Sequence, residues 1–241
     1  MSEQFPDSAK FYDEFNAESA KSPINKRIIG LYKRILKNGL TTDSVNLEIG
    51  CGPGKMTYLL SKKIKEGVIE ATDISPRSIE IAKTKIKNPN VHFKVSDALE
   101  YTPVNESFDN IFLFDVLEHI PEDQHPYLFR KIGKWMKDDS SILINIPNPN
   151  YILFAKKYRP ESLQEIDQSI TLDNLSRAIY HAGLEISFFE TYSIWAENDY
   201  QFIIVKKQTS YMEKLLSNKR NIFQKAIVRL VREYRNLRYR Y

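Results

Sequence analysis

Cysteine is nearly absent from this chain of 241 residues, with Cys51 as its single example. One thiol excludes an internal disulfide framework and is typical of a reducing compartment. No window reaches the length and hydrophobicity of a transmembrane helix, and the N-terminal stretch MSEQFPDSAKFYDEF lacks the apolar core of a signal peptide. We therefore expect a cytoplasmic protein.

A net positive charge is confined to the C-terminal end of the chain. The formal net charge is +4, yet residues 206–241 alone carry eleven Lys or Arg against two Glu, so the preceding residues are net acidic. From Met212 onward, apolar residues recur at helical spacing with basic residues between them, which predicts a basic amphipathic helix over residues 208–241. Such a helix suits peripheral contact with the inner face of a membrane, or packing against a second copy or another partner. The acidic remainder disfavours nucleic acid as a partner.

Strand-like and helix-like segments alternate from Val45 onward. This alternation predicts an α/β fold whose parallel sheet carries helices on both faces and binds ligands beyond the carboxyl ends of its strands. Two helices broken near Pro23 are expected between residues 9 and 38. We expect further helices at 55–65, 76–87, 128–136 and 172–182, and strands beginning at Val45 and covering 68–72, 91–95, 111–114, 142–146, 184–190 and 200–206.

The most specific pattern is NLEIGCGPGK at residues 46–55, where a strand runs into Gly50, Gly52 and Gly54. Glycine has no Cβ, so it adopts φ > 0 and lets the backbone approach a ligand. The helix that follows would turn its positive end toward an anionic group. Asp73 stands 19 residues after Gly54, at the end of the next strand, where a carboxylate reaches ribose hydroxyls. A dinucleotide-binding turn would need glycine at Lys55, which disfavours a pyrophosphate ligand.

Two further motifs follow in the order of the strands. Residues 95–101, VSDALEY, place Asp97 beyond the third strand, and residues 108–120, FDNIFLFDVLEHI, place Asp115, Glu118 and His119 after the fourth. With the glycine turn and Asp73, this ordered set resembles class I S-adenosylmethionine (SAM) dependent methyltransferases over residues 46–206. The DVLEH wording is most similar to the branch that includes ubiquinone, menaquinone, sugar and natural-product methyltransferases. The resemblance implies a Rossmann-like, seven-stranded, mostly parallel sheet that ends in an antiparallel hairpin.

The resemblance also implies the cofactor, SAM, which leaves as S-adenosylhomocysteine (SAH). Cys51 would lie beside it, and a small residue in a tight turn explains this cysteine better than a reactive thiol does. No metal site is expected. The residues expected to hold the cofactor all lie at strand ends: Glu48, Gly50, Cys51, Gly52 and Gly54 around its methionine part, Asp73 on the ribose, Ile74, Asp97 and Ala98 around the adenine, and Phe114 and Asp115 beside the sulfonium.

His119 is the first candidate for a general base, because imidazole titrates near neutral pH. In the alternative interpretation, Glu118 and His119 only orient their loop through bonds to nearby backbone. By resemblance, Tyr12 would fold over the sulfonium and contribute to catalysis; otherwise it packs within an N-terminal helix. His125 is a weaker candidate base.

The expected activity is methyl transfer from SAM to a small-molecule, lipid or saccharide acceptor, with oxygen favoured over nitrogen. Methylation of an amino sugar or another small amine is the first alternative, and a non-catalytic SAM-binding module is the second. We expect residues 1–44 to form a helical cap over the active site, residues 45–207 the SAM-binding core and residues 208–241 the amphipathic helix. Residues 9–22, the loop after His119 and the long connection 147–170 would shape the acceptor pocket, with Asn148 and Asn150 as turn residues beside it.

Overall fold

The computed structural model describes residues 12–13, 20–164 and 167–209 together with residues 229, 234 and 238. It divides into two compact units, Met1–Lys207 and Gln208–Tyr241. The amphipathic helix predicted over 208–241 lies outside the described residues, apart from those single positions near its end. There, the Arg238 guanidinium donates a hydrogen bond to the Tyr234 hydroxyl at 2.9 Å. The division of the chain at residues 44 and 207 stays a prediction.

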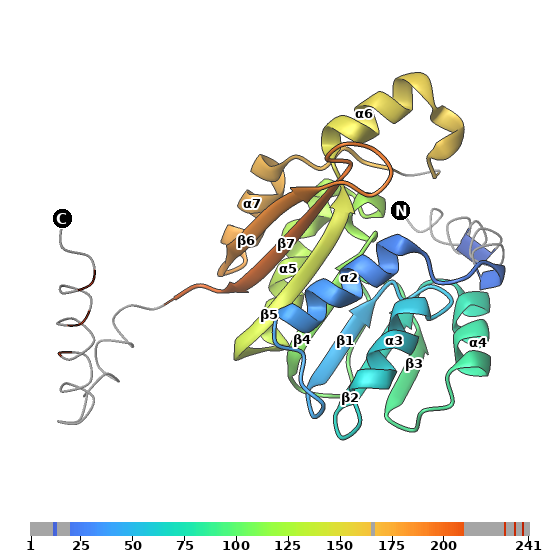
Figure 1. The fold of residues 1–241 in the computed structure, drawn as a ribbon, viewed down its shortest axis with the longest axis vertical. Helices are drawn as coiled ribbons and strands as arrows, with labels where there is room; N and C mark the ends of the chain where they lie inside the picture. Colours follow the sequence, from blue (N-terminus) through green and yellow to red (C-terminus); the bar gives the residue numbers. More distant parts are fainter. Residues whose placement is uncertain are drawn as a thin grey trace. The chain divides into compact units, whose positions relative to one another are not determined.

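A seven-stranded sheet forms the centre of the first unit, in the order β3-β2-β1-β4-β5-β7-β6 (Figure 1). The first five strands run parallel to one another, whereas β7 pairs antiparallel with both β5 and β6. This arrangement confirms the predicted Rossmann-like fold with its final antiparallel hairpin. The strands are β1 (Val45–Ile49), β2 (Val68–Asp73), β3 (Val91–Val95), β4 (Phe108–Phe114), β5 (Met136–Pro147), β6 (Leu184–Tyr192) and β7 (Tyr200–Lys207).

Helices cover both faces of the sheet, each through an apolar stripe at helical spacing. On one face, α2 contributes the buried Leu31 and Ile35 to a cluster with α3 and α4, and in Figure 1 this helix crosses in front of the sheet. On the other face, α5 and α7 pack through residues such as Phe129 and Ile179. The α-helices are α2 (Lys26–Lys37), α3 (Lys55–Lys63), α4 (Pro76–Lys85), α5 (His125–Lys134), α6 (Pro149–Tyr158) and α7 (Leu172–His181), and the 3-10 turns are η1 (Leu117–His119), η2 (Glu122–Gln124) and η3 (Pro160–Ser162).

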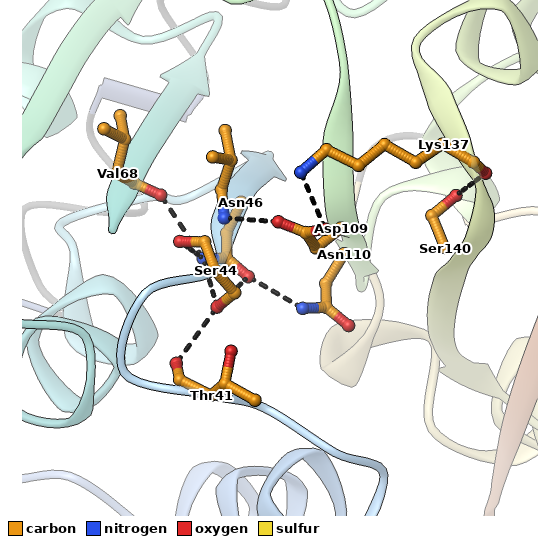
Figure 2. A network of polar contacts seen from close by, with 9 residues as sticks. Thr41, Ser44, Asn46, Val68, Asp109, Asn110, Lys137 and Ser140 are labelled. Atoms are coloured by element: carbon orange, nitrogen blue, oxygen red, sulfur yellow. Dashed lines mark hydrogen bonds and ion pairs between the residues drawn. The ribbon is translucent and has the colours of Figure 1, made fainter. Parts of the chain in front are cut away.

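A buried polar network joins β1 to β4 at their amino ends (Figure 2). The Asn46 side-chain amide donates to the Ser44 carbonyl at 2.7 Å, and Asn110 donates to the Asn46 side-chain oxygen at 2.9 Å. Beside them, Asp109 accepts from the first backbone N–H of β1 and from Lys137, both at 2.8 Å. Because these polar groups satisfy one another, the network stabilises the end of the sheet remote from the predicted site.

The structure corrects several expected elements: α3 and α4 end at Lys63 and Lys85, two residues early, β4 begins already at Phe108, and β6 extends to Tyr192. The strand expected at 142–146 begins already at Met136, where its polar half MKDDSS hides it from a hydrophobicity pattern. The helix expected at 128–136 spans His125–Lys134 instead, because Pro126 is suited to a first helical turn and β5 takes Met136. The connection 147–170 contains α6, which Asn148 caps by accepting from the Asn150 backbone N–H at 2.9 Å.

Candidate functional site

The carboxyl ends of the five parallel strands form one edge of the sheet, and every sequence-predicted cofactor residue lies on or just beyond those ends. Strand order reverses between β1 and β4, which is where ligands of such sheets bind. Because β7 is antiparallel, its first residue Tyr200 pairs with Pro147 at this same edge, and Tyr192 at the end of β6 pairs with Tyr200. The hairpin therefore adds aromatic side chains to the site.

The glycine turn after β1 has the backbone that its sequence predicts. Gly50, Gly52 and Gly54 have φ of 76°, 51° and 81°, values that residues with a Cβ rarely adopt. A Cβ on Gly50 would stand 2.3 Å from a methyl carbon of Val116, which follows β4. Close packing of the turn against the next loop thus excludes any side chain at this position.

Three amides of this turn make hydrogen bonds within the fold. Gly50 and Cys51 both donate to the Thr72 carbonyl, at 2.8 and 2.9 Å, and Gly54 donates back to the Cys51 carbonyl at 3.0 Å. These bonds join the turn to β2 and fix its shape, so the three amides stabilise the turn itself. Burial raises the pKa of the Cys51 thiol, with Asp73 and Glu48 adding to the effect, as expected of an inert cysteine.

Glu48 is a buried carboxyl group directly beneath the turn. Its side chain accepts a hydrogen bond from the Thr57 hydroxyl at 2.6 Å. Burial raises the pKa of Glu48 to about 8, and the charge of Asp73 acts in the same direction, whereas the Thr57 hydrogen bond opposes the shift. A cationic group placed beside Glu48 would favour its ionised form.

Asp73 links the two strand ends that face the cofactor site. One carboxylate oxygen accepts from the Gly52 N–H at 2.7 Å, and the other accepts from the Ser75 N–H at 2.9 Å. Burial raises the pKa of Asp73, although these two backbone bonds lower it. Each oxygen keeps further lone-pair capacity, so the group remains able to accept from two hydroxyls. Ile74 follows it, half-buried.

Asp97 and Ala98 lie in the loop after β3. The Asp97 carboxylate accepts from the Leu99 N–H at 2.7 Å, and burial raises the pKa of Asp97. Ala98 packs against the core on the α5 side of the sheet, whereas Phe114, at the end of β4, packs against the core on the α2 side. The structure therefore places Asp97 and Ala98 beyond β3 and Phe114 at the end of β4, all at the carboxyl edge of the parallel strands.

Asp115 follows β4 with a left-handed backbone of φ 54°, which aspartate tolerates better than most residues do. Its carboxylate forms an ion pair with Arg27, in the first turn of α2, and each side chain is 20% exposed. The Arg27 guanidinium also lies over the Tyr200 ring, 5.8 Å from its centroid. Helix α2 thus delivers a cation to the edge of the sheet.

His119, the last residue of η1, lies against Tyr12 and Asp167. Its Nδ1 lies 3.4 Å from a carboxylate oxygen of Asp167, and its ring meets that of Tyr12 edge-on with centroids 5.6 Å apart. The two candidate catalytic residues therefore lie together, and Asp167 is positioned to orient the imidazole. Their catalytic roles stay predictions.

Glu118 is buried under the same loop. Burial raises the pKa of Glu118, and the charge of Asp167 raises it further, whereas Arg27 lowers it. The Gln168 side chain binds the backbone of this loop. It donates to the carbonyls of Glu118 and Ile120, the latter at 2.6 Å, and accepts from the Glu122 N–H at 3.3 Å. The end of the long connection is thereby fastened to the loop after β4.

His125 serves the fold of this loop. Its Nε2 lies 3.1 Å from the Leu117 carbonyl and 2.9 Å from the Ile120 carbonyl, and burial lowers the pKa of His125. A ring bound to two carbonyl oxygens has a structural role, which removes His125 from the candidate bases.

Sequence reasoning missed Arg27, Asn145, Asp167 and the hairpin tyrosines. Tyr192 donates from its hydroxyl to the Asn145 side-chain oxygen at 2.6 Å, and Arg34 stacks on the Tyr192 ring at 3.9 Å. The sequence did contain one indication of the two arginines, because Arg27 and Arg34 recur at helical spacing with the apolar Leu31. The other contacts depend on strand order.

Two absences can be stated for the described parts of the chain. No three side chains of His, Cys, Asp or Glu gather there as metal ligands. Nor does any helix in those ranges combine the length and apolar character needed to cross a bilayer.

Similarity to known proteins agrees with this geometry. The protein family described as a methyltransferase domain matches residues 47–139. A malonyl-[acyl-carrier protein] O-methyltransferase from Priestia megaterium is 32% identical over 111 residues, which cover 46% of this chain and 38% of that protein. A protein of the same name from Halalkalibacterium halodurans is 25% identical over 193 residues, covering 77% and 70%. The chain thus spans about two fifths of the relative that it matches at the higher identity.

A solved structure shows the same fold. Magnesium protoporphyrin IX methyltransferase from Synechocystis, crystallised with bound SAH, superposes with a TM-score of 0.62 at 13% identity, over 78% of this chain and 90% of that one. The strand order, the glycine turn and the sequence match agree: this chain has the fold of SAM-dependent methyltransferases, and its residues 47–139 match a methyltransferase domain.

Proposed function

We propose that this protein binds SAM at the turn after β1 and transfers its methyl group to an oxygen atom of a small-molecule acceptor. One observation carries the proposal: a left-handed glycine turn lies between a buried glutamate and the aspartate that ends the neighbouring strand. The residues present fit the cofactor. Its ammonium group suits the buried Glu48 carboxyl, which has no cation among the groups that shift its pKa. Its ribose hydroxyls suit the remaining acceptor capacity of Asp73.

The protein's own contribution is to position the acceptor against the methyl group and to exclude water. SAM, when bound, supplies a methyl group on a positively charged sulfur, so the acceptor oxygen must lie in line with that carbon at about 3 to 3.5 Å. Phe114 and Asp115, at the end of β4, would lie beside the sulfur. Tyr12 and His119 would close the site from the side of the N-terminal segment and limit access of water.

The choice of oxygen rests on similarity and remains part of the proposal. The relatives that match at 25% and 32% identity are named as O-methyltransferases of a malonyl group, although the chain covers part of their length. Transfer to the nitrogen of a small amine is the second candidate, favoured by the acidic groups Asp115, Glu118 and Asp167 near the site. Tail contact with a membrane or a second copy, and a cytoplasmic location, stay predictions.

Calorimetric titration with SAH tests the cofactor site. We expect binding by the natural chain and a loss of about 1 to 3 kcal/mol for Asp73→Asn, because an amide replaces a carboxylate that accepts charge-assisted hydrogen bonds. Asp109→Asn is the matched control, since it removes a carboxylate from the opposite end of β4. No binding at SAH concentrations of about a millimolar would refute the proposal, and equal affinities for both variants would remove Asp73 from the site.

A further inference from the structure

Unpaired polar atoms gather around the N-terminal turn of α2. Within the described ranges, seven buried side-chain atoms have no hydrogen-bond partner, and four of them belong to residues grouped around Arg27: Nε of Arg27, Oδ1 of Asp115, Oε2 of Glu118 and Nδ2 of Asn145. Buried polar atoms in folded proteins nearly always find partners, so a group of them at a predicted active site indicates where a ligand binds. Two of the four are N–H donors.

The four residues form one connected set. Arg27 pairs with Asp115, whose backbone N–H donates to the Asn145 carbonyl at 2.8 Å. The Asn145 side-chain oxygen is already occupied by the Tyr192 hydroxyl at 2.6 Å, which directs the amide nitrogen to a different partner. Burial raises the pKa of both Glu118 and Tyr192, and the nearby charge of Arg27 opposes both shifts.

Arg27 is held firmly in this place. Seven residues further along α2, Arg34 forms a two-point ion pair with Glu190 at 3.2 and 3.4 Å, and it stacks on the ring of Tyr192. The buried Leu31 lies between the two arginines. Because the helix is anchored at Arg34, the position of Arg27 at the strand ends is set by the fold, and its 20% exposure leaves it accessible from solvent.

The charges favour an acceptor with a single negative charge. Arg27 presents a planar fork of donors, which matches the two oxygens of a carboxylate, and Asn145 supplies another N–H. Asp115 already offsets part of the arginine charge, which disfavours a doubly charged phosphate. A protonated amine would face both Arg27 and the positive sulfur of the cofactor. The nearby acids offset this little, because Asp115 is paired with Arg27, Asp167 lies against His119, and burial favours the neutral form of Glu118. An anion therefore suits the two unpaired donors better than a cation does.

We propose that the acceptor is a carboxylic acid whose carboxylate is held by Arg27 and Asn145 and is itself methylated. The proposal rests on the proposed function. A lone pair of one carboxylate oxygen forms the new O–CH3 bond while the S–CH3 bond breaks, and the sulfur keeps its electron pair. The products are a methyl ester and neutral SAH, and no proton is released. Such a reaction needs no general base, so His119 and Asp167 position the loop in this reaction.

The stability of the product in alkali separates this proposal from its alternatives. The protein is incubated with methyl-labelled SAM and a bacterial extract of small metabolites, and the purified product is treated with mild alkali. A methyl ester hydrolyses and releases labelled methanol, whereas a methyl ether or methylamine keeps the label. Label that survives alkali would overturn the carboxylate proposal alone. No incorporation of label at all would contradict the methyl transfer proposed above.

Four variants test the residues, with the rate of alkali-labile labelling measured in dilute extract. Arg27→Ala should lower that rate about 10- to 100-fold, the effect of losing a charged hydrogen bond. Arg27→Lys should recover part of it, since lysine keeps the charge and loses the fork. Asn145→Asp should also lower the rate, because it keeps the Tyr192 bond and turns the amide donor into a negative oxygen.

Lys33→Ala is the matched control, because it removes a positive charge from an exposed position of the same helix. SAH affinity measured by calorimetry reports that each variant is folded. We expect Lys33→Ala to keep the rate of the natural chain within about threefold, as for an ordinary surface substitution. Equal rates for Arg27→Ala and Lys33→Ala would overturn the role given to Arg27.

Discussion

The buried carboxyl of Glu48 should make the stability of this protein depend on pH in a way that one substitution removes. Burial raises the pKa of Glu48 from its ordinary value of 4.5 to about 8. Below the lower value, the folded and unfolded chains both hold the proton. Between the two values the unfolded chain loses it and the folded chain keeps it, so the free energy of unfolding falls as pH rises.

The size of the effect follows from the two pKa values. Between pH 5.5 and 7.5, the contribution of Glu48 to the free energy of unfolding should fall by about 2.5 kcal/mol. Glu48→Gln has nearly the same shape, still accepts from Thr57 and carries no ionisable proton. The variant should therefore be more stable than the natural chain by about 1.4 kcal/mol at pH 5.5 and by about 3.9 kcal/mol at pH 7.5, and the two should converge only below the ordinary pKa of the carboxyl group.

Urea unfolding of both proteins without cofactor, followed by circular dichroism at several pH values, measures this difference. Titrating groups that do not interact with Glu48 contribute equally to the two curves and cancel. Glu66→Gln, in the exposed turn before β2, controls for the loss of a negative charge at the surface. If the difference between Glu48→Gln and the natural chain stays constant within about 0.5 kcal/mol from pH 5.5 to 7.5, the reasoning from burial is wrong.

Two further substitutions test other parts of the site. Gly50→Ala should lower the free energy of unfolding by about 2 to 5 kcal/mol, because it combines a positive φ with a methyl group pressed into Val116; urea unfolding measures it, and a loss below 1 kcal/mol would show that the turn relaxes easily. His119→Ala should lower the turnover number less than about tenfold on a carboxylate acceptor, because no proton has to be removed; a loss of 10² to 10⁴ would instead show general-base catalysis and hence a hydroxyl acceptor.

The cofactor half of the site was predictable because its signals are local. Three glycines at alternate positions favour a left-handed backbone, and Asp73 ends the apolar run that forms β2. Each prediction used neighbours in sequence, together with the rule that parallel strands end at one edge. The structure places all of these residues at that edge.

The acceptor half was not predictable by the same means. Arg27 meets Tyr200 only because the last strand runs antiparallel beside β5, which brings together residues 173 positions apart. Helix α6 was missed because the run YILFAKKY follows two prolines and gives no clear helical period on its own. Long-range pairing of this kind leaves no local trace in the sequence.

The way in which Gln168 holds the loop after β4 bears on how such an enzyme changes over time. The bonds that it donates all end on main-chain carbonyl oxygens, and the one that it accepts comes from a main-chain N–H. Every amino acid except proline has both groups, so these hydrogen bonds do not depend on which side chains residues 118, 120 and 122 carry. New acceptors can therefore be selected by mutation in this loop while its attachment persists.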